Sequence, residues 1–457
     1  MSTLQTIKVF LLLGFLPIFW GVGCSNTHSP PDIVSTSDKE FNFNYALLHY
    51  YYYKADKELR EPEAYINNPN ANLLPAKYAN VADIIFMYYD MTDPMTTYYP
   101  HEMFNTVNES ISQSTTEPKS FGMELSSILS VQTVYRKGPA ASAGISRGDT
   151  ILSLNGISLQ GNDSLYNALL SSQSEDTFIF TVKRQNDTLE ISMTRENVLA
   201  PTVYLDSADG VPWIRITKFT ETTNGFSKEG SAKEFEDALN KTTGAKSIIL
   251  DLRGNTGGTV DLCERMSAEL LSQGDTVIIE KKWGMQKNQR ATEESIFTAS
   301  KDGIGKGRYY VLMLDNQSAS CTEIFAAAIT ANLKTPIVGT TSFGKGIGQI
   351  YVTTPDTAFG AVTNTLFYDK DGKTYHTYGF EPDFSIPDAD SALTKAVELA
   401  KEGTFKRTAG YSTQIQPFWG EFKKKAVEKP SPATLLQNLR TGMALRILDH
   451  SLFDFDH

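Results

Sequence analysis

Two short segments in the second half of the chain carry a serine and a lysine in settings that suit catalysis. Ser320 follows an apolar run, residues 309–314, that predicts a buried strand, and precedes residues 324–329, whose composition favours a helix. A serine at such a junction presents its hydroxyl where backbone N–H groups and the positive helix end converge. Lys345 has a glycine on each side, which lets another segment approach closely. The pair predicts a serine nucleophile with a lysine base, so a hydrolase is the leading hypothesis.

A lysine acts as a base only while its amine is neutral. Its ordinary pKa is about 10.4, so it must be desolvated or placed beside other positive charge. Apolar Phe343 and Ile347 flank the Lys345 segment and favour a buried site, although burial itself is not visible in a sequence.

The surrounding region has the pattern of an α/β domain, in which apolar strands alternate with helices. Strands are predicted at residues 211–216, 247–252, 276–279, 309–314 and 336–339, with helices at residues 234–240 and 262–271. We therefore expect residues 201–400 to form an α/β core that positions Ser320 and Lys345.

Residues 119–200 have a different sequence pattern. It predicts short strands, a tight Asn155-Gly156 turn and one helix at residues 164–171. This succession resembles a PDZ domain, a fold that captures peptide C-termini by strand addition. The resemblance implies that the loop of Phe121, Gly122, Met123 and Glu124 holds the peptide carboxylate. The alternative is a PDZ-shaped spacer that binds nothing.

The first 23 residues are expected to be a targeting segment. Lys8 precedes an apolar stretch, residues 9–19, that is too short to span a membrane comfortably. Residues 21–24 are similar to a bacterial lipoprotein cleavage site, which implies lipidation of Cys24, although Gly21 stands where such sites usually have leucine. The alternative is an ordinary export signal. We expect a protein anchored by lipid in the bacterial cell envelope, at the periplasmic or surface face of the outer membrane.

Three further segments complete the chain. Residues 24–40 are polar and contain proline, which suits a flexible tether. Residues 41–118 are rich in tyrosine and leucine and predict an N-terminal helical domain, with helices over residues 45–53 and 81–89. Residues 401–457 are expected to be a partly helical tail, with a helical patch near residues 432–448.

Composition excludes several classes of function. The net charge of −11 argues against a phosphate-backbone partner, so we expect no nucleic acid. The 6 histidines show no zinc-ligand spacing, and no metal or cofactor is expected. If Cys24 carries lipid, Cys263 and Cys321 remain. The sequence does not pair them, and the chain does not look disulfide-stapled.

Four motifs in the core, preceded by the PDZ-like region, resemble the carboxy-terminal processing, or tail-specific, serine protease family. They are Asp-Leu-Arg-Gly-Asn-Thr-Gly-Gly at residues 251–258, Ser-Ala-Ser-Cys-Thr-Glu at 318–323, Thr-Ser-Phe-Gly-Lys-Gly at 341–346 and Gly-Phe-Glu-Pro-Asp at 379–383. The resemblance covers roughly residues 40–400. It implies a multidomain chain with a ClpP/crotonase-like α/β protease core, a PDZ domain upstream and a helical domain at the N-terminus.

The resemblance also assigns the site residues. Ser320 is implied as the nucleophile and Lys345 as the general base, with Gln349 hydrogen-bonded to the lysine. Ser318 is a competing serine, but its spacing to Glu323 and Lys345 does not match the family.

An oxyanion hole needs two backbone N–H groups aimed at the developing negative charge. One is expected from Cys321, directly after the nucleophile. The other is expected from Gly257 or Gly258, and the sequence leaves that choice open.

Three other interpretations compete with the catalytic one. Ser320 and Glu323 also fit a capping box that only satisfies the helix start. Residues 339–345 match a phosphate-binding loop until Gly346, which replaces the Ser/Thr that would hold Mg²⁺. The whole chain could be a catalytically silent PDZ-containing scaffold lipoprotein.

The leading hypothesis is an exported serine endopeptidase of the C-terminal processing type. Its partners are then protein or peptide substrates with accessible C-termini and, through the anchor, a membrane. Association into a homo-oligomer stays open.

Overall fold

The computed structural model describes residues 39–59, 61, 93–99, 101–111, 115–126, 128–172, 176–355, 357–419 and 445–448. The predicted targeting segment and Cys24, the predicted helix over residues 81–89 and most of the tail lie outside these residues. No helix within the described ranges is long and apolar enough to cross a membrane.

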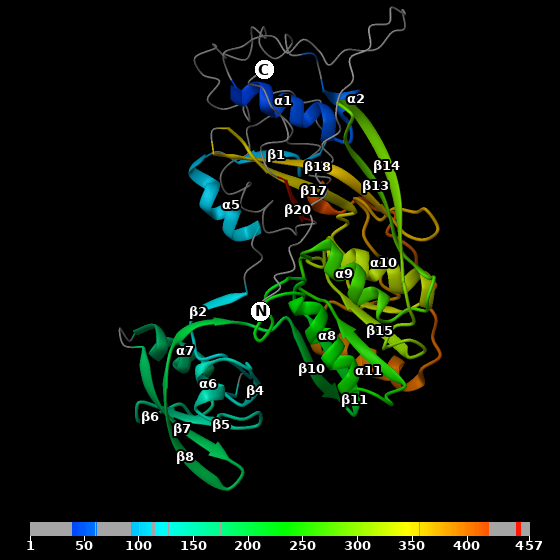
Figure 1. The fold of residues 1–457 in the computed structure, drawn as a ribbon. Coiled ribbons are helices and arrows are strands. Elements are labelled where there is room, and N and C mark those ends of the chain that lie inside the picture. The colour runs from blue at the N-terminus through cyan, green and yellow to red at the C-terminus, as the bar shows by residue number, and fades with distance from the viewer. Residues whose placement is uncertain are drawn as a thin grey trace, which may run out of the picture.

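The core is built on a mostly parallel sheet with helices on both faces (Figure 1). Its strands, in spatial order, are β10 (Val203–Ala208), β11 (Val211–Ile216), β12 (Ser247–Asp251), β15 (Tyr309–Leu314), β16 (Ile337–Gly339) and β19 (Phe384–Ser385). Only β10 and β11 pair antiparallel.

Side chains alternate across this sheet, as the pleat requires. On β12, Ile248 and Leu250 join a cluster with α8 (Gly230–Lys241), α9 (Val260–Ala268) and α10 (Cys321–Leu333). Ile249 points into the opposite cluster, which contains α11 (Ala389–Glu402). Because both faces are covered, the central strands read as continuous apolar runs, which is why the sequence predicts them.

A second, mainly antiparallel sheet lies beside the first and carries the lysine segment. Its order is β14 (Gln289–Thr298), β13 (Thr276–Gln286), β18 (Phe359–Tyr368), β17 (Ile347–Thr353) and β20 (Leu445–Leu448), with β1 (Thr97–Tyr99) also paired to β18. The predicted helical patch is wrong at residues 445–448, because these residues form a strand parallel to β17.

The first helix of the N-terminal region packs against the second sheet. Helix α1 (Lys39–Tyr51) shares a hydrophobic cluster with Ile350 and Val352 of β17 and Val362 of β18. It lies across this sheet in Figure 1, with α2 (Ala55–Glu58) beside it. Farther along, η2 (His101–Met103) and α5 (Phe104–Ile111) follow β1. Tyrosine-rich α1 therefore completes the core of the second sheet.

The PDZ-like region forms its own small barrel-like unit around a cluster that includes Phe121, Phe178 and Phe180. Its elements are β3 (Met123–Leu125), β4 (Val131–Val134), α6 (Pro139–Ser142), β5 (Thr150–Leu154), β6 (Ile157–Ser158), α7 (Asp163–Ser172), β7 (Thr177–Arg184) and β8 (Asp187–Thr194). The two segments that join it to the core, β2 (Thr116–Ser120) and β9 (Glu196–Leu199), pair antiparallel.

Candidate active site

Ser320 stands between β15 and α10 in a backbone conformation that few residues adopt. Its φ of 60° and ψ of −118° lie outside the regions that L-residues populate, a strain that clusters at functional sites. Its side chain is 1% exposed, and Oγ has no hydrogen-bond partner among the described residues. A buried hydroxyl without a partner is costly in a purely structural role.

Ser318, two residues earlier, has the opposite character. Its Oγ donates to the carbonyl of Leu252 at 3.0 Å and lies 3.1 Å from Oδ1 of Asp315, and it accepts from the Asp315 N–H. This serine is fully occupied in holding the loop after β15.

Lys345 is buried, with 1% of its surface exposed. Burial lowers the pKa of its amine to about 7, while the negative charges of Asp93 and Glu323 oppose the shift. A lysine with this pKa is substantially neutral near neutral pH, as a general base must be. The structure thus shows the burial of Lys345 that its predicted role as a base requires.

The Glu323 carboxylate connects the serine and lysine segments. Its side chain is fully buried, and Oε2 accepts from the N–H groups of Ser320, at 3.1 Å, and Lys345, at 2.7 Å. Oε1 accepts from the Ser342 hydroxyl at 2.5 Å and the Gly344 N–H at 2.7 Å. Burial raises the pKa of Glu323 to about 7, against these hydrogen bonds. The capping interaction of Glu323 with Ser320 is thus one part of a larger clamp.

Gln349 lies on β17, at an irregularity in the register between Gly348 and Gln349. Its side chain is 3% exposed, and Nε2 donates to the Met95 carbonyl at 2.9 Å. The segment before β1 therefore holds the Gln349 amide through its Nε2 group. Oε1 accepts no hydrogen bond from the described residues.

Gly257 lies against Ser320 and Cys321 at the start of α10, whereas Gly258 packs against Phe219. A Cβ on Gly257 would lie 2.9 Å from Cβ of Ser320 and 3.0 Å from the Cys321 nitrogen, so only glycine fits there. The Gly257 N–H already donates to Oδ1 of Asn255 at 2.8 Å. The Cys321 N–H belongs to the first helical turn, whose N–H groups have no partner within a helix.

Cys321 also forms a disulfide with Cys263 of α9. Both side chains are fully buried, and their Cα atoms are 5.7 Å apart, a normal separation for a disulfide. The expectation of a chain without a disulfide staple is therefore wrong. The two cysteines come together because α9 and α10 pack side by side, which no local pattern reveals.

The predicted peptide-binding loop is partly engaged within the protein. The Phe121 ring packs edge-on against Phe180, and the Gly122 carbonyl accepts from the Tyr135 N–H. The Glu124 carboxylate pairs with Arg215 of core strand β11 at 2.9 Å. Glu124 therefore connects the PDZ-like unit to the core.

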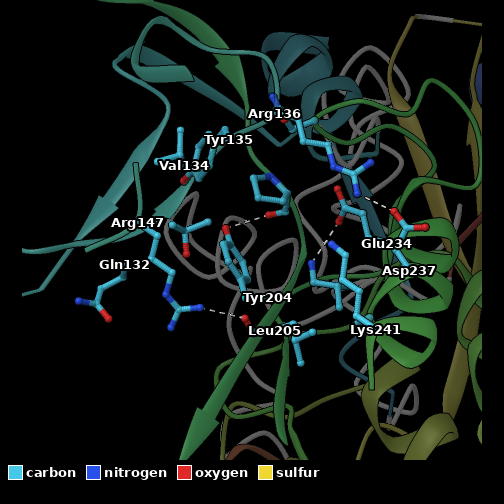
Figure 2. A pocket seen from close by; sticks show the side chains of 15 residues that line it. Gln132, Val134, Tyr135, Arg136, Arg147, Tyr204, Leu205, Glu234, Asp237 and Lys241 are labelled. Atoms are coloured by element: carbon cyan, nitrogen blue, oxygen red, sulfur yellow. Dashed lines mark hydrogen bonds and ion pairs between the residues drawn. The ribbon is translucent and has the colours of Figure 1, made fainter. Parts of the chain in front are cut away.

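A cavity of roughly 320 Å³ lies at the same boundary (Figure 2). Arg136 from the PDZ-like unit reaches across and pairs with Asp237 of α8 at 2.6 Å. Both side chains are about half exposed, so the pair contributes little to stability. The two units thus touch through polar contacts at this boundary.

Comparisons with known proteins agree with this architecture. Residues 210–386 match the family model "Peptidase family S41", and residues 111–194 match "PDZ domain". The carboxy-terminal processing protease CtpA of Bacillus subtilis (strain 168) is 29% identical over 328 residues, which cover 70% of this chain and 66% of the relative. A "Probable CtpA-like serine protease" of Staphylococcus aureus (strain bovine RF122 / ET3-1) is 26% identical over 301 residues, covering 65% and 58%.

The chain thus spans less than two thirds of the length of these relatives. A solved structure of a protein assigned to the S41 proteases, from Bacteroides fragilis NCTC 9343, matches with a TM-score of 0.50 at 16% identity. The match covers 79% of this chain and 97% of that chain, and it supports the fold alone.

The core is thus similar to peptidase family S41 over residues 210–386. The region before it is similar to a PDZ domain, and 70% of the chain is similar to a carboxy-terminal processing protease. The likeness of its core to the ClpP/crotonase fold stays a prediction, as does a separate N-terminal helical domain.

Sequence reasoning missed three contributors to the site. Asp93 and Met95 come from the N-terminal region and reach the lysine segment because β1 pairs with β18. Glu323 was recognised only as a helix cap, and its bonds to the lysine segment depend on tertiary structure. The spacing of Glu323 after Ser320 was the one signal available.

Proposed function

We propose that this protein is a serine endopeptidase that cleaves protein substrates through an acyl-enzyme, with Ser320 as nucleophile and Lys345 as general base. The observation that carries the proposal is the buried Lys345, whose pKa is lowered to about 7 and whose backbone N–H shares Oε2 of Glu323 with that of Ser320. A buried lysine and a strained serine whose hydroxyl has no hydrogen-bond partner among the described residues, both held by one carboxylate, are features that cluster at functional sites.

In the proposed reaction, Lys345 takes the proton of the Ser320 hydroxyl as Oγ attacks the scissile carbonyl. The lysine then gives the proton to the leaving amine, and a water activated in the same way releases the acyl group. Oε1 of Gln349 is the acceptor that we assign to the lysine amine, since an amide orients a neutral amine without the ionic pairing that would keep it protonated.

The oxyanion is assigned to the N–H groups of Cys321 and Gly258. Gly257 is disfavoured as the second donor because its N–H is bound to Asn255. Gly257 instead provides the space that the Ser320 side chain needs.

The PDZ domain is proposed to recruit or gate substrates by their C-termini, through the loop at Phe121–Glu124. The pairing of Glu124 with Arg215 supports a connection between this loop and the core. We further propose that the protein is exported and lipid-anchored at Cys24 in the cell envelope, as the sequence of residues 1–24 indicates.

The test is proteolysis of fluorescently labelled casein and of a peptide with a free apolar C-terminus. Wild type should cut both, and Ser320→Ala and Lys345→Ala should not. Lys334→Gln, on an exposed residue at the end of α10, is the lysine control, and Ser318→Ala tests the competing serine. Each variant is checked by circular dichroism. Cleavage by folded Ser320→Ala, or an inactive wild type on a broad peptide set, refutes the proposal.

A further inference from the structure

The Cys263–Cys321 disulfide joins the two segments that frame the proposed oxyanion hole. Cys321 directly follows Ser320 and is the first residue of α10. Cys263 lies in the first turn of α9, which begins at Val260, just after Gly258. The covalent bond therefore fixes the start of one helix against the start of the other.

Hydrogen bonds through Asn255 also connect the two segments. Its carbonyl accepts from the Ala319 N–H at 3.1 Å and from the Thr322 hydroxyl at 2.8 Å. Gly257 and Gly258 have φ values of 108° and 148°, and glycine loses more conformational freedom than other residues when it is fixed. A covalent link close by limits the movement of this turn relative to Ser320.

We propose that the Cys263–Cys321 disulfide is a redox modification site that positions the oxyanion hole, so that the oxidised protein turns over faster than the dithiol form. This inference rests on the proposed peptidase function. It predicts an effect on kcat rather than on substrate binding, because oxyanion donors act mainly in the transition state.

The chemistry requires a thiol–disulfide oxidant. The two cysteine thiols lose two protons and two electrons as the S–S bond forms, and a disulfide-bearing oxidant takes them up to become two thiols. Both side chains are 0% exposed, so the bond forms while α9 and α10 are still open to solvent. Disulfides persist in oxidising compartments, which agrees with the proposed export.

The experiment compares one protein in two redox states. The full chain is purified without reductant, and a second sample is unfolded and refolded in excess dithiothreitol. Alkylation under denaturing conditions and peptide mapping establish the state of Cys263 and Cys321 in each. On labelled casein we expect kcat to fall about 10-fold on reduction, less than the factor of 10² to 10³ for removing a whole donor, with little change in KM.

Two controls separate positioning from other effects. Cys263→Ala should have the lower kcat and no response to dithiothreitol. Hydrogen exchange of peptides that span residues 252–260 and 318–323 should be faster in the reduced protein and in this variant. That readout does not depend on proteolysis, so it tests the inference even if casein is not cut.

Three outcomes would overturn the inference. One is free thiols at both positions in protein purified without reductant. Another is an equal kcat in the two redox states. The third is unchanged hydrogen exchange in both peptides. If the oxidised wild type does not cut casein but the hydrogen exchange differs as expected, the proposed peptidase function is refuted. The positioning of the Gly257 and Gly258 turn by the disulfide is then still supported.

Discussion

Oε2 of Glu323 lies 2.7 Å from the backbone nitrogen of Lys345, and the same oxygen accepts the N–H of Ser320. One side chain on α10 therefore holds the lysine segment against the serine that directly precedes the same helix. Because the carboxylate is acceptor-only, all four donors around it can be satisfied together. The relative position of nucleophile and base thus depends on one buried side chain.

We expect Glu323→Gln to lower kcat by about 100-fold or more. The amide of glutamine would turn N–H groups toward two of the present donors, and each hydrogen bond to a charged group is worth roughly 1.5–3 kcal/mol. Casein turnover by the folded variant measures the effect, with exposed Glu293→Gln as the matched control. A folded Glu323→Gln enzyme with wild-type kcat would show that the clamp is dispensable.

Gly257→Ala should abolish most activity, by about 100-fold or more, since its Cβ would press on Cβ of Ser320 and the Cys321 nitrogen. Gly254→Ala is the control, because Gly254 also has a positive φ, 71°, but a Cβ there meets nothing within 4 Å. Comparing the two turnover rates separates the clash from backbone strain. Equal turnover rates in the two variants would show that Gly257 is not part of the active site.

Asp93→Asn should move the acidic limb of the pH–rate profile to lower pH. The negative charge of Asp93 raises the pKa of Lys345, so its removal lets the amine become neutral at lower pH. Exposed Asp56→Asn is the control. A limb that stays in place, or moves upward, would mean that Asp93 does not act on the titrating group.

The sequence was informative wherever structure is local. The apolar run before Ser320 does form strand β15, and the residues after it form α10, because a buried parallel strand and a buried helix leave strong local patterns. The helices predicted at residues 234–240 and 262–271 correspond to α8 and α9. The Ser320 and Lys345 motifs were found by their resemblance to a family, and their roles stay predictions.

Interactions between distant segments could not be predicted. The pairing of Cys263 with Cys321 requires α9 to pack on α10, and the contact of Met95 with Gln349 joins residues that lie 254 positions apart in the sequence. The sequence does not predict strand β18, because the apolar residues of this strand are mixed with glycine and threonine. The burial of Lys345, on which its basicity depends, results from these same long-range contacts.

The most direct test of the central claim is the pH dependence of kcat/KM for casein between pH 5 and pH 9. If neutral Lys345 is the base, activity should rise with pH through a single ionisation near pH 7, since protonation below this pH removes the base. The pKa of Glu323 is also about 7, so the profile is repeated with Asp93→Asn, whose charge acts on Lys345. We expect kcat/KM to rise near pH 7 in the wild type, and at a lower pH in this variant. A profile that is flat over this range, or that rises only near the ordinary pKa of lysine, would contradict it.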